Sequence, residues 1–347
     1  MVIEHNLGAR ALSIGQIALR GQAVLAPLSG VTDVVFRRIA KRFGAALVVS
    51  EMVASDEFVL GTEEARLRAE GEGITPHVVQ LAGCDASWMG QAARLAEASG
   101  AALIDINMGC PAKRVTGGYA GSALMRDLDN ASRIIESVLA AVRCPVTVKM
   151  RLGWDHDSIN APELARRAVA IGAAAVTVHG RTRQQFYKGT ADWAAIAPVA
   201  GAVAIPVIAN GDVRSAADAR HCLAQSGAAA VMIGRAAVGR PWLVGQIAAE
   251  LRGDTAEEPS PAEKAASAVE HYEGLLALYG RDVGLRHARK HLAAYADEAG
   301  RFSFTLDREA RIRLVTSEAP HEVVALLERL YASPQQAAGA LPLREAA

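Results

Sequence analysis

The chain of 347 residues is long enough for one large domain, or for a large domain and a small one. Its 37 basic and 37 acidic residues cancel, so composition does not indicate a nucleic-acid partner, and any basic surface must be local. No apolar run approaches the roughly 20 residues that span a bilayer, and residues 1–10 lack the pattern of a secretory signal. We therefore expect a cytoplasmic protein without membrane contact.

The four cysteines, Cys84, Cys110, Cys144 and Cys222, form no C-x-x-C pair and no cluster with histidines. This spacing differs from that of structural zinc sites and iron–sulfur clusters, so we expect no metal. A reducing compartment also disfavours disulfide bonds.

Apolar runs alternate with helical patterns over most of the chain. Eight runs are predicted to be strands: Ala23–Ala26, Ala46–Val49, His77–Leu81, Leu103–Ile106, Val146–Met150, Ala175–Val178, Pro206–Ala209 and Ala230–Ile233. Their continuous apolar character is typical of parallel strands covered on both faces. Intervening segments predict helices: Asp33–Phe43, Trp88–Ser99, Ala131–Val142, Ala161–Ile171, Trp193–Ala200 and Ala216–Gln225.

Glycines follow several of these predicted helices, where a left-handed C-terminal cap is favoured: Gly44, Gly100, Gly172 and Gly227. Eight strand–helix repeats within about 230 residues match the size of an α/β fold of the (β/α)8 TIM-barrel type. A doubly wound open sheet is the alternative. It fits less well, because the units are equal and no G-x-G-x-x-G follows the first strand.

The composition changes near residue 252, so we expect residues 1–252 to form the barrel. Residues 253–261 are polar and contain proline, which predicts a linker. Residues 262–335 predict a small all-helical C-terminal domain, and residues 336–347 a disordered tail. Its helices are predicted over Ala262–Tyr279, Leu285–Ala299, Asp307–Ser317 and Pro320–Tyr331.

TIM barrels build their active sites where the strands end. Almost every predicted strand here ends in polar residues, including Ser29, Glu51, Gln80, Asn107, Cys110, Lys149, Arg151, His179, Arg181, Asn210, Asp212 and Arg235. Each alone has a structural explanation, since a lysine often extends to solvent and a histidine often makes structural hydrogen bonds. Their convergence on one rim favours a functional pocket.

The residue types on this rim favour a flavin. Gly211 and Gly234 would let the backbone approach a phosphate, with Arg235 as counter-charge. The rim offers no histidine–carboxylate ligand triad, which disfavours a metal barrel. A phosphate-binding barrel without flavin stays open on spacing alone.

The ring of a flavin would also find partners. Gln80 and Asn107 can each donate and accept hydrogen bonds, as an isoalloxazine edge requires. Lys149, supported by His179, would place positive charge where a reduced flavin becomes anionic.

Cys110 lies just past the fourth predicted strand, in DINMGCP at 105–111, and Pro111 ends strand pairing there. Free cysteines are mostly buried and inert. A thiol at an exposed strand end, followed by the glycine-rich segment 117–121, is instead placed for chemistry.

Long motifs of this chain resemble those of the tRNA-dihydrouridine synthases. They are APLSGVTDVVFR (26–37), EM (51–52), DINMGCPAKRV (105–115), GSALMRD (121–127), VKMRLGW (148–154), VHGRTRQQFYKGTADW (178–193), NGDV (210–213) and MIGRAAVGRPWL (232–243). The resemblance covers the barrel, RHARKH (286–291) resembles the family's helical domain, and the bacterial DusB subgroup is the most similar.

The resemblance implies an FMN enzyme that reduces the C5=C6 bond of D-loop uridines in tRNA, with NADPH as electron donor. It implies hydride transfer from the flavin to C6 and a proton from Cys110 to C5, which makes Cys110 a general acid. The residues implied to hold FMN are Pro27, Leu28, Ser29, Gln80, Lys149, Asn210, Gly211, Asp212, Gly234 and Arg235, with Asn107 and His179 near the ring.

Basic residues outline an RNA-binding surface. On the rim, these are Lys113, Arg114, Arg181 and Arg183. In the helical region, Arg286, Arg289 and Lys290 share one helix face. A solvated face is the alternative for these three, but beside a basic rim a phosphate-tracking groove is favoured. The target base must be turned out of its stack, and the segment 113–123 is predicted to move Cys110 over the flavin.

Two positions depart from the family pattern: Leu28 replaces a common methionine, and Ala294-Tyr295 replaces an aromatic pair, which weakens an RNA-stacking role there. Two other functions remain open, an FMN-dependent TIM-barrel reductase of a free pyrimidine or enone and a tRNA-binding flavoprotein that no longer reduces. The sequence leaves the tRNA position open, with 17 suggested by the DusB resemblance, and a monomer is expected.

Overall fold

The computed structural model describes residues 12–301 and 306–332, so the predicted tail over 336–347 lies outside the described residues. The chain divides into two compact units. The barrel unit comprises Met1–Ala237 and Trp242–Ala256, and the helical unit comprises Val238–Pro241 and Glu257–Ala347. The boundary at Ala256 falls within the segment expected to be a linker.

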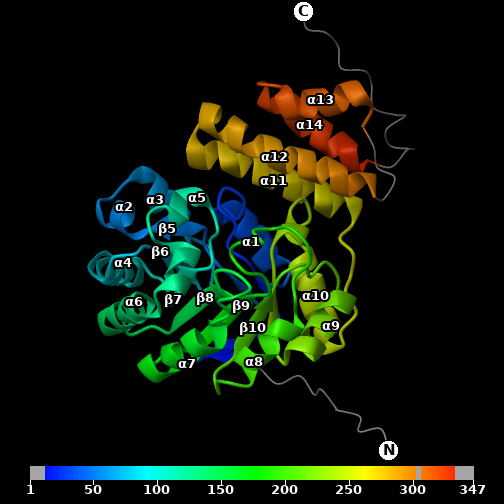
Figure 1. Cartoon of the computed structure of the whole chain (residues 1–347). Coiled ribbons are helices and arrows are strands. Elements are labelled where there is room, and N and C mark those ends of the chain that lie inside the picture. The colour runs from blue at the N-terminus through cyan, green and yellow to red at the C-terminus, as the bar shows by residue number, and fades with distance from the viewer. Residues whose placement is uncertain (1–11, 302–305, 333–347) are drawn as a thin grey trace, which may run out of the picture. The chain divides into compact units, whose positions relative to one another are not determined.

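The barrel unit contains a sheet of nine strands with helices around it (Figure 1). The strands are β3 (Ala23–Leu25), β4 (Leu47–Val48), β5 (Met52–Ala54), β6 (Val78–Ala82), β7 (Leu103–Met108), β8 (Val146–Arg151), β9 (Ala175–His179), β10 (Val207–Asn210) and β11 (Ala230–Ile233). Their order is β4-β3-β11-β10-β9-β8-β7-β6-β5, and all neighbours are parallel. This curled sheet confirms the predicted TIM-barrel fold.

The second strand of the barrel consists of two pieces. β4 pairs with β3, and β5 pairs with β6. Between them, Ser50 N donates to Val78 O at 3.1 Å, which keeps the segment against β6. The predicted strand Ala46–Val49 is therefore only the first half of a broken strand, and the nine observed strands correspond to the eight predicted ones.

The helices of the barrel unit follow the strands. They are α1 (Val34–Arg42), α2 (Ser55–Val59), α3 (Glu63–Ala69), α4 (Ala86–Ala98), α5 (Lys113–Thr116), α6 (Leu128–Ala141), α7 (Ala161–Ile171), α8 (Ala197–Ala200), α9 (Ala216–Ser226) and α10 (Leu243–Arg252). Side-chain caps start five of them, α1, α3, α4, α6 and α9. In α1, Asp33 accepts from Val35 N and Phe36 N. The predicted glycine caps are confirmed, with Gly172 and Gly227 at φ 120° and 63°.

An antiparallel hairpin, β1 (Leu12–Ile14) and β2 (Ile17–Leu19), precedes the barrel and was not predicted. Its buried side chains form one apolar cluster with residues at the starts of the barrel strands, among them Leu47, Val78, Leu103, Ala175 and Ala230. The hairpin therefore closes the N-terminal end of the barrel, opposite the rim where the strands end.

The helical unit consists of α11 (Pro261–Tyr279), α12 (Arg281–Gly300), α13 (Arg308–Thr316) and α14 (Pro320–Tyr331), close to the predicted ranges. A capping box starts α11, because Ser260 accepts from Glu263 N while Glu263 accepts from Ser260 N. Tyr272, Leu292 and Leu327 are buried in its core. None of the helices in the described ranges is both long and apolar enough to cross a bilayer.

Candidate active site

The strand register brings the predicted polar residues to one end of the barrel interior. Asn107 on β7 lies opposite Lys149 on β8, and two residues earlier Asp105 lies opposite Thr147. Side chains two residues apart on a barrel strand face the same side. These residues are all buried, so they form stacked layers inside the barrel.

A hydrogen-bonded network forms the floor of the site. Gln80 Nε2 donates to Asp105 Oδ2 at 2.7 Å, and Asn107 Nδ2 donates to Gln80 Oε1 at 2.8 Å. Thr147 Oγ1 donates to the other oxygen of Asp105 at 2.6 Å. Burial raises the pKa of Asp105, although these hydrogen bonds and the charge of Lys149 lower it. The network fixes which way the amides of Gln80 and Asn107 point.

Lys149 lies in this interior as a buried cation. Its Nζ donates to Asn210 Oδ1 at 3.1 Å, and Asn210 in turn donates to Met232 O at 2.8 Å. Burial lowers the pKa of Lys149, and the charge of Arg151 lowers it further. An ammonium has three donors, and the described residues provide one hydrogen bond, so Lys149 has donors left for a ligand.

His179 ends β9 and is held as a neutral ring. Arg181 Nη1 lies 3.3 Å from His179 Nε2, and a guanidinium can only donate, so Nε2 accepts and Nδ1 carries the proton. Burial lowers the pKa of His179 well below 6.5, and the charges of Arg151 and Lys149 lower it further. The Nδ1–H group is therefore available as a donor.

Asp212 joins two arginines at the rim. Arg181 donates to its Oδ2 at 2.5 Å, and Arg235 donates to its Oδ1 at 3.1 Å. Burial raises the pKa of Asp212, but its hydrogen bonds and the two cations outweigh this effect and bring the pKa below its ordinary value. Arg181 is 1% exposed, so its guanidinium is directed at Asp212 rather than at solvent, and its role in RNA contact stays a prediction.

Asn107 and Ser122 hold Cys110 in place. Asn107 Oδ1 accepts from Gly109 N at 3.1 Å and from Cys110 N at 2.9 Å. Ser122 donates to Cys110 O through its amide at 3.0 Å and its hydroxyl at 2.9 Å. The intervening chain folds back over Cys110 through Gly121 at φ +59°, where a Cβ would lie 2.8 Å from Cys110 O. Cys110 itself is half-buried.

Arg151 was not assigned a role from the sequence, yet it connects two loops of the rim. Its Nε donates to Gly109 O at 2.8 Å, and its Nη1 donates to Thr182 O at 2.8 Å and Phe186 O at 2.9 Å. Burial lowers the pKa of Arg151 to about 10, so it stays a cation at neutral pH. Its spacing of two residues from Lys149 is the sequence signal that could have identified Arg151 as a residue of the site.

The loops after β3 and β11 lie beside each other, because these strands pair. A Cβ on Gly234 would lie 3.7 Å from Leu28 Cδ2. Glu51 Oε2 accepts from Gly30 N at 2.7 Å and so fixes the loop with Pro27, Leu28 and Ser29.

Gly211 was predicted to let the backbone approach a phosphate, and the structure shows that it also has a packing role. A Cβ there would lie 2.6 Å from Ala191 Cβ.

The predicted RNA-contacting residues occupy both units. Lys113 and Arg114 are exposed on α5 of the barrel unit. Arg183 lies 4.7 Å from the Trp154 ring centroid and donates to Thr116 Oγ1 at 3.5 Å. Within the helical unit, α12 exposes Arg286, Arg289 and Lys290. Tyr295 is buried there, with its hydroxyl 3.0 Å from His271 Nδ1, which agrees with the weakened expectation of RNA stacking at this position.

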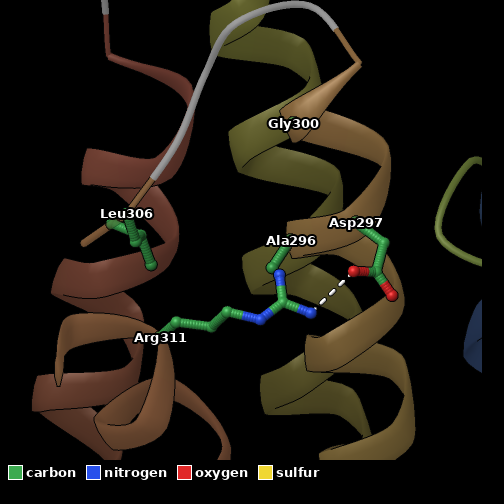
Figure 2. A pocket seen from close by; sticks show the side chains of 5 residues that line it. All are labelled: Ala296, Asp297, Gly300, Leu306 and Arg311. Atoms are coloured by element: carbon green, nitrogen blue, oxygen red, sulfur yellow. Dashed lines mark hydrogen bonds and ion pairs between the residues drawn. The ribbon is translucent and has the colours of Figure 1, made fainter. Parts of the chain in front are cut away.

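The helical unit contains a cavity of about 150 Å³. Figure 2 shows the residues that line it, Ala296, Asp297, Gly300, Leu306 and Arg311. Arg311 crosses it and donates to Asp297 Oδ1 at 2.6 Å. None of the predicted site residues lines this cavity, so it is separate from the rim chemistry.

Comparisons with known proteins identify the family of the chain. The model of the dihydrouridine synthase (Dus) family matches residues 24–330. A probable tRNA-dihydrouridine synthase from Rhizobium leguminosarum bv. phaseoli is 54% identical over 331 residues, which cover 95% of this chain and 100% of that protein. tRNA-dihydrouridine synthase B from Xanthomonas axonopodis pv. citri is 48% identical, over 83% of this chain and 87% of that protein.

Solved structures of similar fold include a 6-hydroxypseudooxynicotine amine oxidase from Pseudomonas geniculata N1, with a TM-score of 0.53 and 14% identity over 74% of this chain and 52% of that chain. Histamine dehydrogenase from Rhizobium sp. 4-9 has the same TM-score of 0.53, with 13% identity over 76% of this chain and 50% of that chain. At these identities the likeness shows the fold alone.

Proposed function

Because the chain belongs to the dihydrouridine synthase family, we propose that it is a tRNA-dihydrouridine synthase that uses FMN and NADPH to reduce the C5=C6 bond of D-loop uridines. The observation that carries the proposal is the group of buried donors, Gln80, Asn107, Lys149 and His179, at the rim that also presents Cys110.

The residues of the rim fit a flavin mononucleotide. Lys149 retains donors and positive charge for the electron-rich edge of the ring, and the fixed amides of Gln80 and Asn107 offer hydrogen bonds nearby. Asp212 would repel a phosphate, but Arg181 and Arg235 neutralise it. The remaining residues proposed to hold FMN are Pro27, Leu28, Ser29, Asn210, Gly211 and Gly234.

FMN, when bound, would supply the hydride that goes to C6 of the uracil. Cys110 supplies the proton at its Sγ, and Asn107 and Ser122 fix the backbone from which this thiol extends. Lys149 and Arg151 place positive charge close to Cys110. His179 acts as a neutral donor through Nδ1.

The tRNA would meet Lys113, Arg114 and Arg183 on the barrel unit and Arg286, Arg289 and Lys290 on the helical unit. Exposed cations attract phosphates without regard to sequence. The likeness to a tRNA-dihydrouridine synthase B makes position 17 the first uridine to examine.

The test begins with the visible spectrum of the purified protein after FMN is supplied. We expect flavin bands, their loss on addition of NADPH, and their return with unmodified tRNA but not with free uridine. A protein that cannot take up FMN would refute the proposal. Reoxidation by free pyrimidines or enones, without a response to tRNA, would favour a small-molecule reductase. Dihydrouridine in tRNA from a deletion strain, and from the complemented strain, gives the corresponding result in cells.

A further inference from the structure

Two aromatic residues at the rim adopt a backbone conformation that side chains avoid. Within residues 12–301 and 306–332, the non-glycine residues with positive φ are Tyr119 at 61°, Phe186 at 55° and Asp212 at 56°. They lie in the loops after β7, β9 and β10, all at the C-terminal rim. Aspartate tolerates this region, whereas bulky residues are strained there. Such strain is often associated with function.

The same two aromatic side chains are open to solvent. Tyr119 is 75% exposed and Phe186 is 41% exposed, although apolar rings gain from burial. Gly117, Gly118 and Gly121 surround Tyr119, so a glycine at this position would also suit the local chain. Neither the backbone conformation nor core packing explains a tyrosine there.

A short series of hydrogen bonds connects the two loops. Tyr119 N donates to Thr116 O at 3.1 Å, and Thr116 Oγ1 accepts from Arg183 Nη2 at 3.5 Å. Arg183 O in turn accepts from Phe186 N at 3.0 Å. The loops of the two exposed aromatics are therefore joined by the contact between Thr116 and Arg183.

Both residues are also tied to the loop of Cys110. Tyr119 precedes Gly121 by two residues, so their Cα atoms are within about 8 Å, and Gly121 packs against Cys110. Phe186 O accepts from Arg151, which also holds Gly109 O. The backbones of both aromatics are thus connected to the loop that carries Cys110.

We propose that Tyr119 and Phe186 stack on the nucleobases that flank the uridine being reduced. This inference rests on the proposed function. A uridine turned out of the RNA leaves the faces of its neighbours without stacking partners. Exposed aromatic rings supply such faces for unpaired RNA. The adjacent cations Lys113, Arg114 and Arg183 favour a nucleic acid over an apolar protein partner.

The test replaces each ring by an aliphatic side chain of similar apolar character, in Tyr119→Leu and Phe186→Leu. We expect each change to raise KM for tRNA about tenfold, and the double variant to raise it about a hundredfold, because each base–aromatic stack contributes separately. The rate of flavin reduction by NADPH should stay unchanged. Leu60→Ala, which alters another exposed apolar side chain (72% exposed), is the matched control and should leave KM unchanged.

A second readout reports stacking directly. A tRNA that carries 2-aminopurine beside the target uridine should lose fluorescence on binding the wild-type protein and keep most of it with the double variant.

Three results would overturn the inference. With an active wild-type enzyme, an unchanged KM in both leucine variants would refute stacking while leaving the proposed function intact. If the leucine variants slow flavin reduction by NADPH as much as they impair the reaction with tRNA, the rings cover the flavin instead of stacking on the RNA. A wild-type protein that makes no dihydrouridine would refute the proposed function, and the inference with it.

Discussion

The two ends of the barrel unit have opposite character. At the N-terminal end, the hairpin β1–β2 and the first residues of the strands form a continuous apolar cluster. At the C-terminal rim, the same strands carry buried amides, cations and a carboxylate. β7 shows the contrast within one strand, because Leu103 belongs to the apolar cluster whereas Asn107 positions Cys110. One end therefore packs the barrel closed, and the other holds the residues for which we propose chemistry.

The rim also contains all of the described non-glycine residues with positive φ, whereas the hairpin uses Gly15 at φ 54° for its turn. Strained side chains are tolerated where they serve a ligand, and glycine is used where only the turn matters. Substitutions at the two ends should consequently separate activity from stability.

The largest expected effect is that of Cys110→Ala on turnover. Loss of a positioned general acid should slow dihydrouridine formation about 100- to 10,000-fold, because no proton reaches C5, while the flavin is still reduced by NADPH. Single-turnover reoxidation by tRNA and the dihydrouridine content of the product measure this effect. Cys144→Ala, at the N-terminal end of β8, is the control and should react at the wild-type rate. Normal turnover by Cys110→Ala would remove the thiol from the mechanism.

Ile14→Ala should lower the stability of the protein rather than its activity. Ile14 is 1% exposed in the hairpin, so the truncation leaves a cavity and should lower the free energy of unfolding by about 2–5 kcal/mol. Turnover of the folded protein should not change. Urea unfolding measures the loss, with the neighbouring exposed residue in Ser13→Ala as control. A loss as small as that of the control would show that the hairpin contributes little to the barrel.

The smallest expected effect is a pH dependence at the rim. The pKa of His179 is well below 6.5 in the folded protein, so below pH 6.5 the unfolded chain binds a proton that the folded chain does not. Stability should fall as the pH falls through this range. Between pH 7.5 and 5.5 the wild type should lose about 1 kcal/mol more than His179→Gln, whose amide oxygen can still accept from Arg181. Urea unfolding at both pH values measures this, and equal losses would contradict a neutral buried ring.

The sequence was informative where a pattern repeats locally. The apolar runs located the strands, and Gly172 and Gly227 marked helix ends, because strand burial and left-handed caps impose their own residue preferences. Gln80, Asn107 and Lys149 were singled out because each lies near the end of a predicted strand. The structure places Asn107 opposite Lys149, and Gln80 opposite Asp105 in the adjacent layer.

Long-range contacts set the limit of that prediction. Asp105 has the two-residue spacing of the interior face, yet its role as acceptor for Gln80 and Thr147 depends on three strands at once. An arginine at the end of a strand, such as Arg181, is predicted from the sequence to contact RNA. That Arg181 is instead buried against Asp212 depends on the tertiary structure. The strands of the hairpin are too short to show a periodic pattern.

The hydrogen bonds from Ser122 to Cys110 O close the segment between these residues into a loop whose two ends are joined at its base. A loop closed in this way can change its shape without displacing the residue at its base. Arg151 restrains that base from the other side through Gly109 O. The movement of Cys110 that the sequence predicts for the segment 113–123 would therefore have to break these hydrogen bonds from Ser122 and Arg151.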